Sequence, residues 1–137
     1  MKQSTEKPPN WEAIKKFFPE VDSPNWKPIF CYGDTIYNPT KQDLANRPDL
    51  IVHEEVHMKQ QGKSPDFWWE RYFLNPEFRL EQEVEAYRAQ YKYMSKHIKD
   101  RETLAWFLSE ISRDLSSELY GNIISKQDAW SRIRSVV

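Results

Sequence analysis

The sequence is poor in the residues that mark several large classes of protein. Its 137 residues include one cysteine and three glycines. The single cysteine, Cys31, cannot form an internal disulfide or share a zinc ion with a second thiolate, which favours a reducing compartment. No apolar run approaches the roughly 20 residues of a membrane span, and no apolar signal core follows the polar N-terminus. We therefore expect a cytoplasmic protein that has no membrane partner.

A surplus of positive charge is also absent. The chain has 20 lysine and arginine residues against 21 aspartate and glutamate residues, a formal net charge of −1. Proteins that hold nucleic acid by neutralising its phosphates carry a basic patch or tail. The charge balance therefore predicts no nucleic-acid partner, and it leaves the oligomeric state open.

Aromatic residues, in contrast, are frequent, with six Trp, seven Tyr and seven Phe. Large aromatic side chains let a small domain bury much apolar area with few residues. We expect a polar, flexible segment at residues 1–10, followed by a single domain over residues 11–137.

Two of the three histidines form the pattern H-E-x-x-H, from His53 to His57. Residues four apart on an α-helix lie on one face, so both imidazoles can reach a single metal ion. Glu54, next to the first histidine, can reach a water molecule bound to that ion. Zinc (Zn2+) is the ion that such a site usually holds, although other divalent ions fit the same ligands.

Hydrophobic periodicity predicts a mainly α domain of the α+β class, with one small β-hairpin. Apolar and aromatic residues at 28–32 and 35–37 flank Gly33-Asp34, a signal for a two-residue turn. Helical spacing and capping residues predict helices over 11–18, 49–61, 65–74, 76–97, 100–120 and from 125 through Val136. The H-E-x-x-H motif therefore lies on a helix that follows the hairpin.

A catalytic zinc usually has three protein ligands, so one ligand must come from outside the motif. The candidates are Glu81, Glu83 and Glu85, on the helix predicted over 76–97. With the apolar stripe of that helix centred on Leu80, Glu83 lies about 60° from its centre, at the border of the buried face. Glu81 and Glu85 lie about 100° and 140° away on the other side. We predict Glu83 as the third ligand and keep Glu85 as the alternative.

H-E-x-x-H followed by a second helix with E-x-x-A resembles the gluzincin metallopeptidases. Here E-x-x-A is Glu83-Val84-Glu85-Ala86, and its first glutamate follows His57 by 26 residues. The resemblance implies a zincin-like fold, a zinc-ligand role for Glu83, and a strand before the motif helix that lines the substrate cleft. From about Trp26 onward the chain is similar to small phage and bacterial proteins of this type. Tyr87 departs from the pattern, because many relatives have there an Asp or Asn that supports a ligand.

These residues together predict a zinc-dependent peptidase that acts on a peptide or protein substrate. Glu54 would serve as the general base, and Tyr72 and Tyr87 are candidates for stabilising the oxyanion. The hairpin could present an edge to which an extended peptide adds as a strand. Two other interpretations fit the same motif: a helical binding protein with a structural or vestigial metal site, and another kind of metal-assisted hydrolase.

Overall fold

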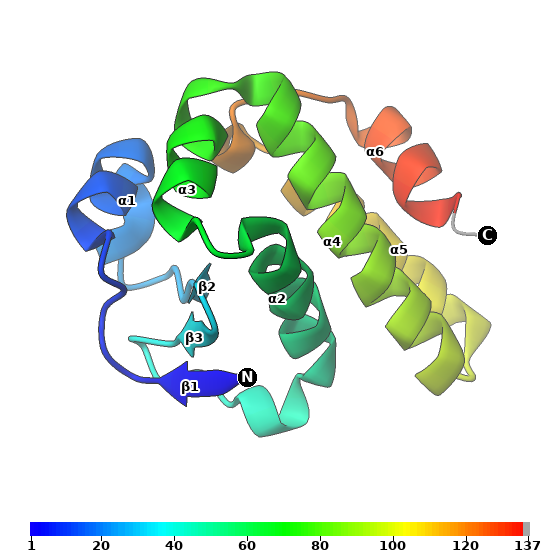
Figure 1. Ribbon diagram of the computed structural model, residues 1–137. Helices are drawn as coiled ribbons and strands as arrows, with labels where there is room; N and C mark the ends of the chain where they lie inside the picture. The colour runs from blue at the N-terminus through cyan, green and yellow to red at the C-terminus, as the bar shows by residue number, and fades with distance from the viewer. Residues whose placement is uncertain (136–137) are drawn as a thin grey trace.

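Six α-helices and a small sheet make up residues 1–135, the part of the chain that the computed structural model describes (Figure 1). This arrangement confirms the predicted mainly α (α+β) class. Short 3-10 turns lie at Pro19–Asp22, Leu44–Asn46 and Glu118–Tyr120. The α-helices are α1 (Trp11–Phe17), α2 (Pro48–Gln61), α3 (Pro65–Leu74), α4 (Pro76–His97), α5 (Arg101–Leu115) and α6 (Lys126–Arg134).

The predicted hairpin is present, within a sheet of three strands. β2 (Phe30–Tyr32) and β3 (Thr35–Tyr37) are antiparallel and connect through Gly33, whose φ of 62° is one that glycine adopts without strain. β1 (Lys2–Ser4) pairs with β3 in parallel, so β3 is the central strand and β2 an edge strand. The sequence did not predict β1, because its three polar residues lack the alternation of a half-buried strand.

The predicted helix boundaries are mostly within two residues of the observed ones. Asn75, Asp100 and Ser125 accept the expected capping hydrogen bonds from backbone N–H groups three residues later. The predicted end of α5 at residue 120 was wrong, because the helix stops at Leu115. Ser116 and Ser117, which follow, donate their hydroxyls to backbone carbonyls three residues earlier and so compete with the helical bonds. Val136, expected in the last helix, lies outside the described residues.

Two hydrophobic clusters flank α2. Aromatic residues of α3 dominate the first cluster, which also contains residues of α1 and β2, while the second joins α4, α5 and α6. The ring of His57 packs against Trp68 of the first cluster, with centroids 5.2 Å apart. The ring of His53 packs against Tyr87 of the second, with centroids 4.5 Å apart. The motif histidines therefore lie between the two clusters.

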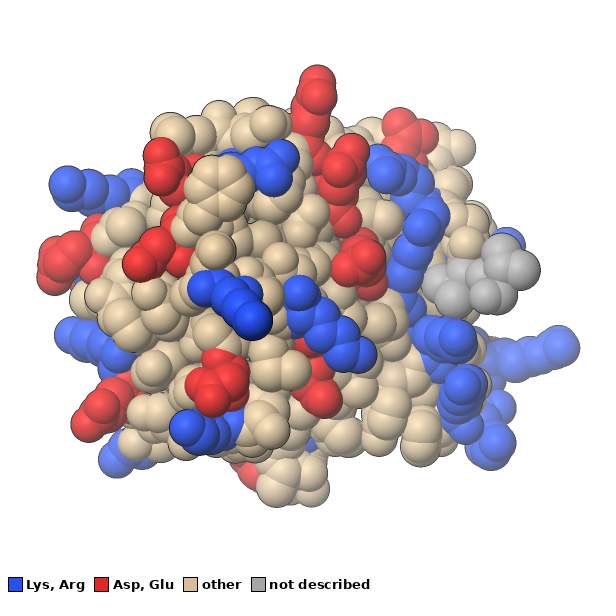
Figure 2. All heavy atoms as spheres, viewed as in Figure 1, with Lys and Arg blue, Asp and Glu red and all other residues tan. Residues whose placement is uncertain are grey.

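Charges of both signs are mixed over the face shown in Figure 2, and lysine and arginine gather at its right-hand side, toward the end of α4. The second half of α4 contains no acidic residue after Glu85 and ends with Lys96 and His97. Positive charge at the C-terminus of a helix interacts favourably with the helix dipole.

Across residues 1–135, no helix is both long and apolar enough to cross a membrane.

Candidate metal centre

The position of α2 is fixed at both of its ends. Pro48 occupies its first turn, and Gly62 ends it with a φ of 56°. Next to that end, the buried Gln61 joins the helix to the hairpin: its amide donates to the carbonyl of Cys31 at 2.7 Å and accepts from the N–H of Gly33 at 2.7 Å. These bonds hold the motif helix against β2.

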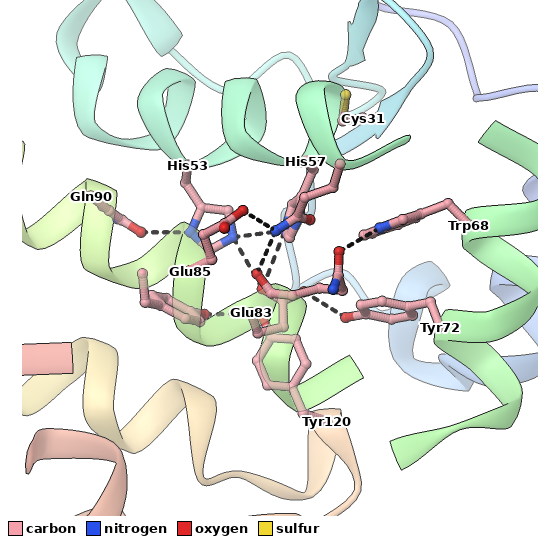
Figure 3. A network of polar contacts seen from close by, with 12 residues as sticks. Cys31, His53, His57, Trp68, Tyr72, Glu83, Glu85, Gln90 and Tyr120 are labelled. Atoms are coloured by element: carbon pink, nitrogen blue, oxygen red, sulfur yellow. Dashed lines mark hydrogen bonds and ion pairs between the residues drawn. The ribbon is translucent and has the colours of Figure 1, made fainter. Parts of the chain in front are cut away.

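The side chains of His53, His57 and Glu83 meet between α2 and α4 (Figure 3). The Nε2 atoms of the two histidines are 3.2 Å apart, and one oxygen of Glu83, Oε1, lies 3.2 Å from His53 Nε2 and 3.3 Å from His57 Nε2. All three residues are buried. The structure thus brings together the three residues that the sequence analysis proposed as ligands.

The other ring nitrogen of His53 fixes which of its nitrogens carries the proton. Nδ1 lies 2.9 Å from the amide oxygen of Gln90, and the amide nitrogen of Gln90 donates to Asp49 at 2.9 Å. Asp49 can only accept, so the amide of Gln90 must present its oxygen to His53. His53 therefore donates from Nδ1, and in the neutral ring Nε2 is left with a free lone pair. Arg47 in turn holds Asp49 through two bonds of 3.1 and 3.0 Å.

An equivalent arrangement orients His57. Its Nδ1 lies 2.8 Å from the amide oxygen of Gln60, whose nitrogen donates to the carbonyl of Gln82 at 3.1 Å and to the Glu85 carboxylate at 2.8 Å. Both partners are acceptors, so Nε2 of a neutral His57 also carries a lone pair. Glu85, the alternative ligand, is exposed and contacts Gln60. Glu85 therefore contacts the residue that orients His57, and it does not join the group formed by His53, His57 and Glu83.

Two imidazole lone pairs and a carboxylate oxygen therefore point at one another, which requires a positive charge between them. Burial alone would raise the pKa of Glu83, but the two imidazoles hold it well below its ordinary value. Burial lowers the pKa of His57, and Glu83 outweighs this effect and raises it to about 9. A proton can join only two of the three atoms. A metal ion can join all three, since ligands about 2.0 Å from a tetrahedral ion lie roughly 3.3 Å apart.

Three tyrosines surround the Glu83 carboxylate. Tyr72 donates its hydroxyl to the second oxygen of Glu83 at 2.7 Å, and burial and this carboxylate raise its pKa well above the ordinary value. Its proton is therefore already engaged, which leaves Tyr72 poorly placed as an oxyanion donor. The hydroxyls of Tyr87 and Tyr120 lie 2.9 Å apart. One bond between them uses one proton, so this pair keeps a second proton to donate.

A cleft of about 810 Å³ opens beside the three residues. The side chain of Glu54 lines it together with both histidines and is buried. Glu54 makes no hydrogen bond or ion pair with any residue from 1 to 135. Burial raises its pKa, and the nearby imidazoles counteract this rise only in part. An unpartnered carboxylate next to the motif histidines is free to bind a water molecule or a substrate.

The single cysteine and the third histidine of the chain lie away from this group. Cys31 is buried in β2, where burial raises the pKa of its thiol, and His97 is exposed at the end of α4, where its ring stacks on Tyr93. Gln90 and Asp49, which hold His53 in place, were not among the predicted site residues. Helical spacing contains a signal for Asp49, since it lies four residues before His53 and thus on the same face of α2.

Comparison with protein-family models, with curated proteins and with solved structures found no match.

Proposed function

We propose that this protein is a zinc-dependent peptidase of the gluzincin type. The observation that carries the proposal is the convergence of three buried acceptor atoms, from His53, His57 and Glu83, beside the unpartnered carboxylate of Glu54. Structural zinc sites are usually closed by four protein ligands, whereas catalytic sites have three and leave one position open. Three ligands at the side of a cleft therefore favour a catalytic site over a structural or vestigial one.

Each residue of the proposed site has a separate role in hydrolysis. Zinc, when bound, lowers the pKa of water and polarises a carbonyl group. Glu54 accepts a proton from the attacking water and delivers it to the leaving amine. In the Tyr87–Tyr120 pair, the hydroxyl whose hydrogen is not used between the two rings donates a hydrogen bond to the developing oxyanion. Tyr72 and Gln90 hold Glu83 and His53 in place.

The shape of the cleft supports an extended peptide as the substrate. Residues 27–31, which lead into β2, form one of its walls. No strand among residues 1–135 pairs with the outer edge of β2, but the carbonyl of Cys31 already accepts from Gln61 at 2.7 Å and from Trp69 at 3.1 Å. An added peptide would therefore pair along residues 27–30, ahead of Cys31. The central strand β3 has no free edge, because β1 and β2 cover both of its sides.

Metal analysis combined with three substitutions tests the proposal. Wild-type protein purified without a histidine tag should contain about one zinc per chain, and Glu83→Gln should lose it. Glu85→Gln is the matched control and should keep its zinc. Glu54→Gln should keep zinc and lose hydrolysis of a quenched fluorescent peptide library. Wild-type protein that takes up no added zinc, or Glu54→Gln protein that hydrolyses peptides at the wild-type rate, would refute the proposal.

A further inference from the structure

One wall of the cleft carries an unusual set of side chains, all on α5. Trp106, Glu110 and Asp114 are spaced four residues apart, so they form one stripe on this helix, and all three line the cleft. Trp106 is 63% exposed, although most of the other tryptophans pack into the core. These three side chains form a surface with one large exposed aromatic ring and two carboxylates. Packing of the core does not explain why they share one face of the helix.

Negative charge on this wall is only partly neutralised. Arg113 forms an ion pair with Glu110 at 2.9 Å, but Asp114 has no ion pair with any described residue. Partial burial and the nearby Glu110 carboxylate raise the pKa of Asp114, and the positive charges of Arg113 and Arg47 counteract this rise only in part. Two basic residues, Lys27 and Arg47, also line the cleft, and the guanidinium of Arg47 is engaged by Asp49. Like charges four residues apart destabilise a helix, and the ion pair with Arg113 offsets this repulsion only at Glu110.

We propose that this stripe binds a basic side chain of the substrate, so that the protein selects peptides with lysine or arginine near the bond that is cleaved. The aliphatic part of such a side chain packs on the indole of Trp106, and its charged end reaches Glu110 and Asp114. The same cleft contains Glu54, which is buried, unpartnered and next to the motif histidines. A peptide that occupies the cleft therefore contacts the stripe and the metal centre together.

This inference rests on the proposed function for its link to cleavage, and a binding experiment separates the two. Zinc-loaded Glu54→Gln protein is titrated with fluorescent octapeptides of a neutral host sequence, which differ only in having Lys, Gln or Glu at one scanned position. We expect the Lys peptide to bind about tenfold more tightly than the Gln peptide at one position, with the preference falling as salt is added. The Glu peptide should bind most weakly.

Three substitutions in the same background assign the preference. Asp114→Asn keeps the shape of the side chain and should abolish the preference, and Trp106→Ala should weaken binding of the Lys peptide. Glu102→Gln, an exposed acidic residue of α5 that does not line the cleft, is the control and should leave the preference unchanged. Equal binding of Lys and Gln peptides at every position, binding of no peptide, or a preference that survives Asp114→Asn would overturn the inference.

Hydrolysis of the same peptides by the wild-type protein distinguishes the two failures. If the Lys preference depends on Asp114 but no peptide is cleaved, the inference about the cleft stands and the proposed peptidase function fails. If peptides are cleaved without preference for a basic residue, the proposed function stands and the inference fails.

Discussion

Replacing Gln90 by leucine should weaken zinc binding without removing a ligand. Gln90 is 2% exposed and connects His53 Nδ1 to Asp49 through two bonds of 2.9 Å. Leucine has a similar volume but can neither accept from the imidazole nor donate to the carboxylate. The ring of His53 then loses the contact that fixes its orientation and keeps its proton on Nδ1.

The size of the effect follows from these two lost bonds. Loss of a group that orients a ligand typically lowers metal affinity by about 10- to 100-fold. This range corresponds to about 1.4 to 2.7 kcal/mol of binding free energy. The substitution also leaves His53 Nδ1 and one bond of Asp49 unsatisfied in the core, and each such group costs about 1 to 3 kcal/mol of folding stability. Zinc affinity and metal-free stability should therefore fall together.

Gln61→Leu is the matched control, because Gln61 is equally buried and also makes two bonds, but to the hairpin. It should lower stability by a similar amount and leave zinc affinity near the wild-type value. Urea unfolding of chelator-treated protein measures the stability, and titration against a competing chelator of known affinity measures zinc binding. If zinc affinity falls no further in Gln90→Leu than in Gln61→Leu, Gln90 does not position the ligand and the reasoning is refuted.

Three further predictions follow from the same contacts. Tyr72→Phe removes the donor to Glu83 and should lower zinc affinity about tenfold, measured by the same competition; an unchanged affinity would contradict the role of this bond. In metal-free protein the folded-state pKa of His57, about 9, exceeds its ordinary 6.5, so its stabilisation is complete below about pH 6.5 and is lost as the pH rises through 9. Thermal melting of chelator-treated protein should show this decline, which excess zinc should suppress. Gly62→Ala should cost about 1 to 3 kcal/mol in urea unfolding because of its φ of 56°, while leaving zinc content unchanged.

The sequence by itself determined the elements and the three candidate ligands. Periodicity, capping residues and a two-residue turn predicted the helices and the hairpin, because these signals are local and depend on residues only a few positions apart. Spacing of four residues was enough to place His53 and His57 on one face of α2, and the border of an apolar stripe was enough to favour Glu83 over Glu85. Local signals failed for β1, whose three polar residues become a strand only by pairing with β3.

Only the tertiary structure decided how the candidate site is held together. Gln90, 37 residues after His53, contacts the Nδ1 atom of that histidine, and Tyr72 and Tyr120 reach the site from α3 and from the turn after α5. The cleft likewise exists only because residues of α2, α4, α5 and the segment that leads into β2 come together beside the candidate metal site. Such contacts depend on how distant helices pack, and no spacing along the chain encodes the direction in which one helix meets another.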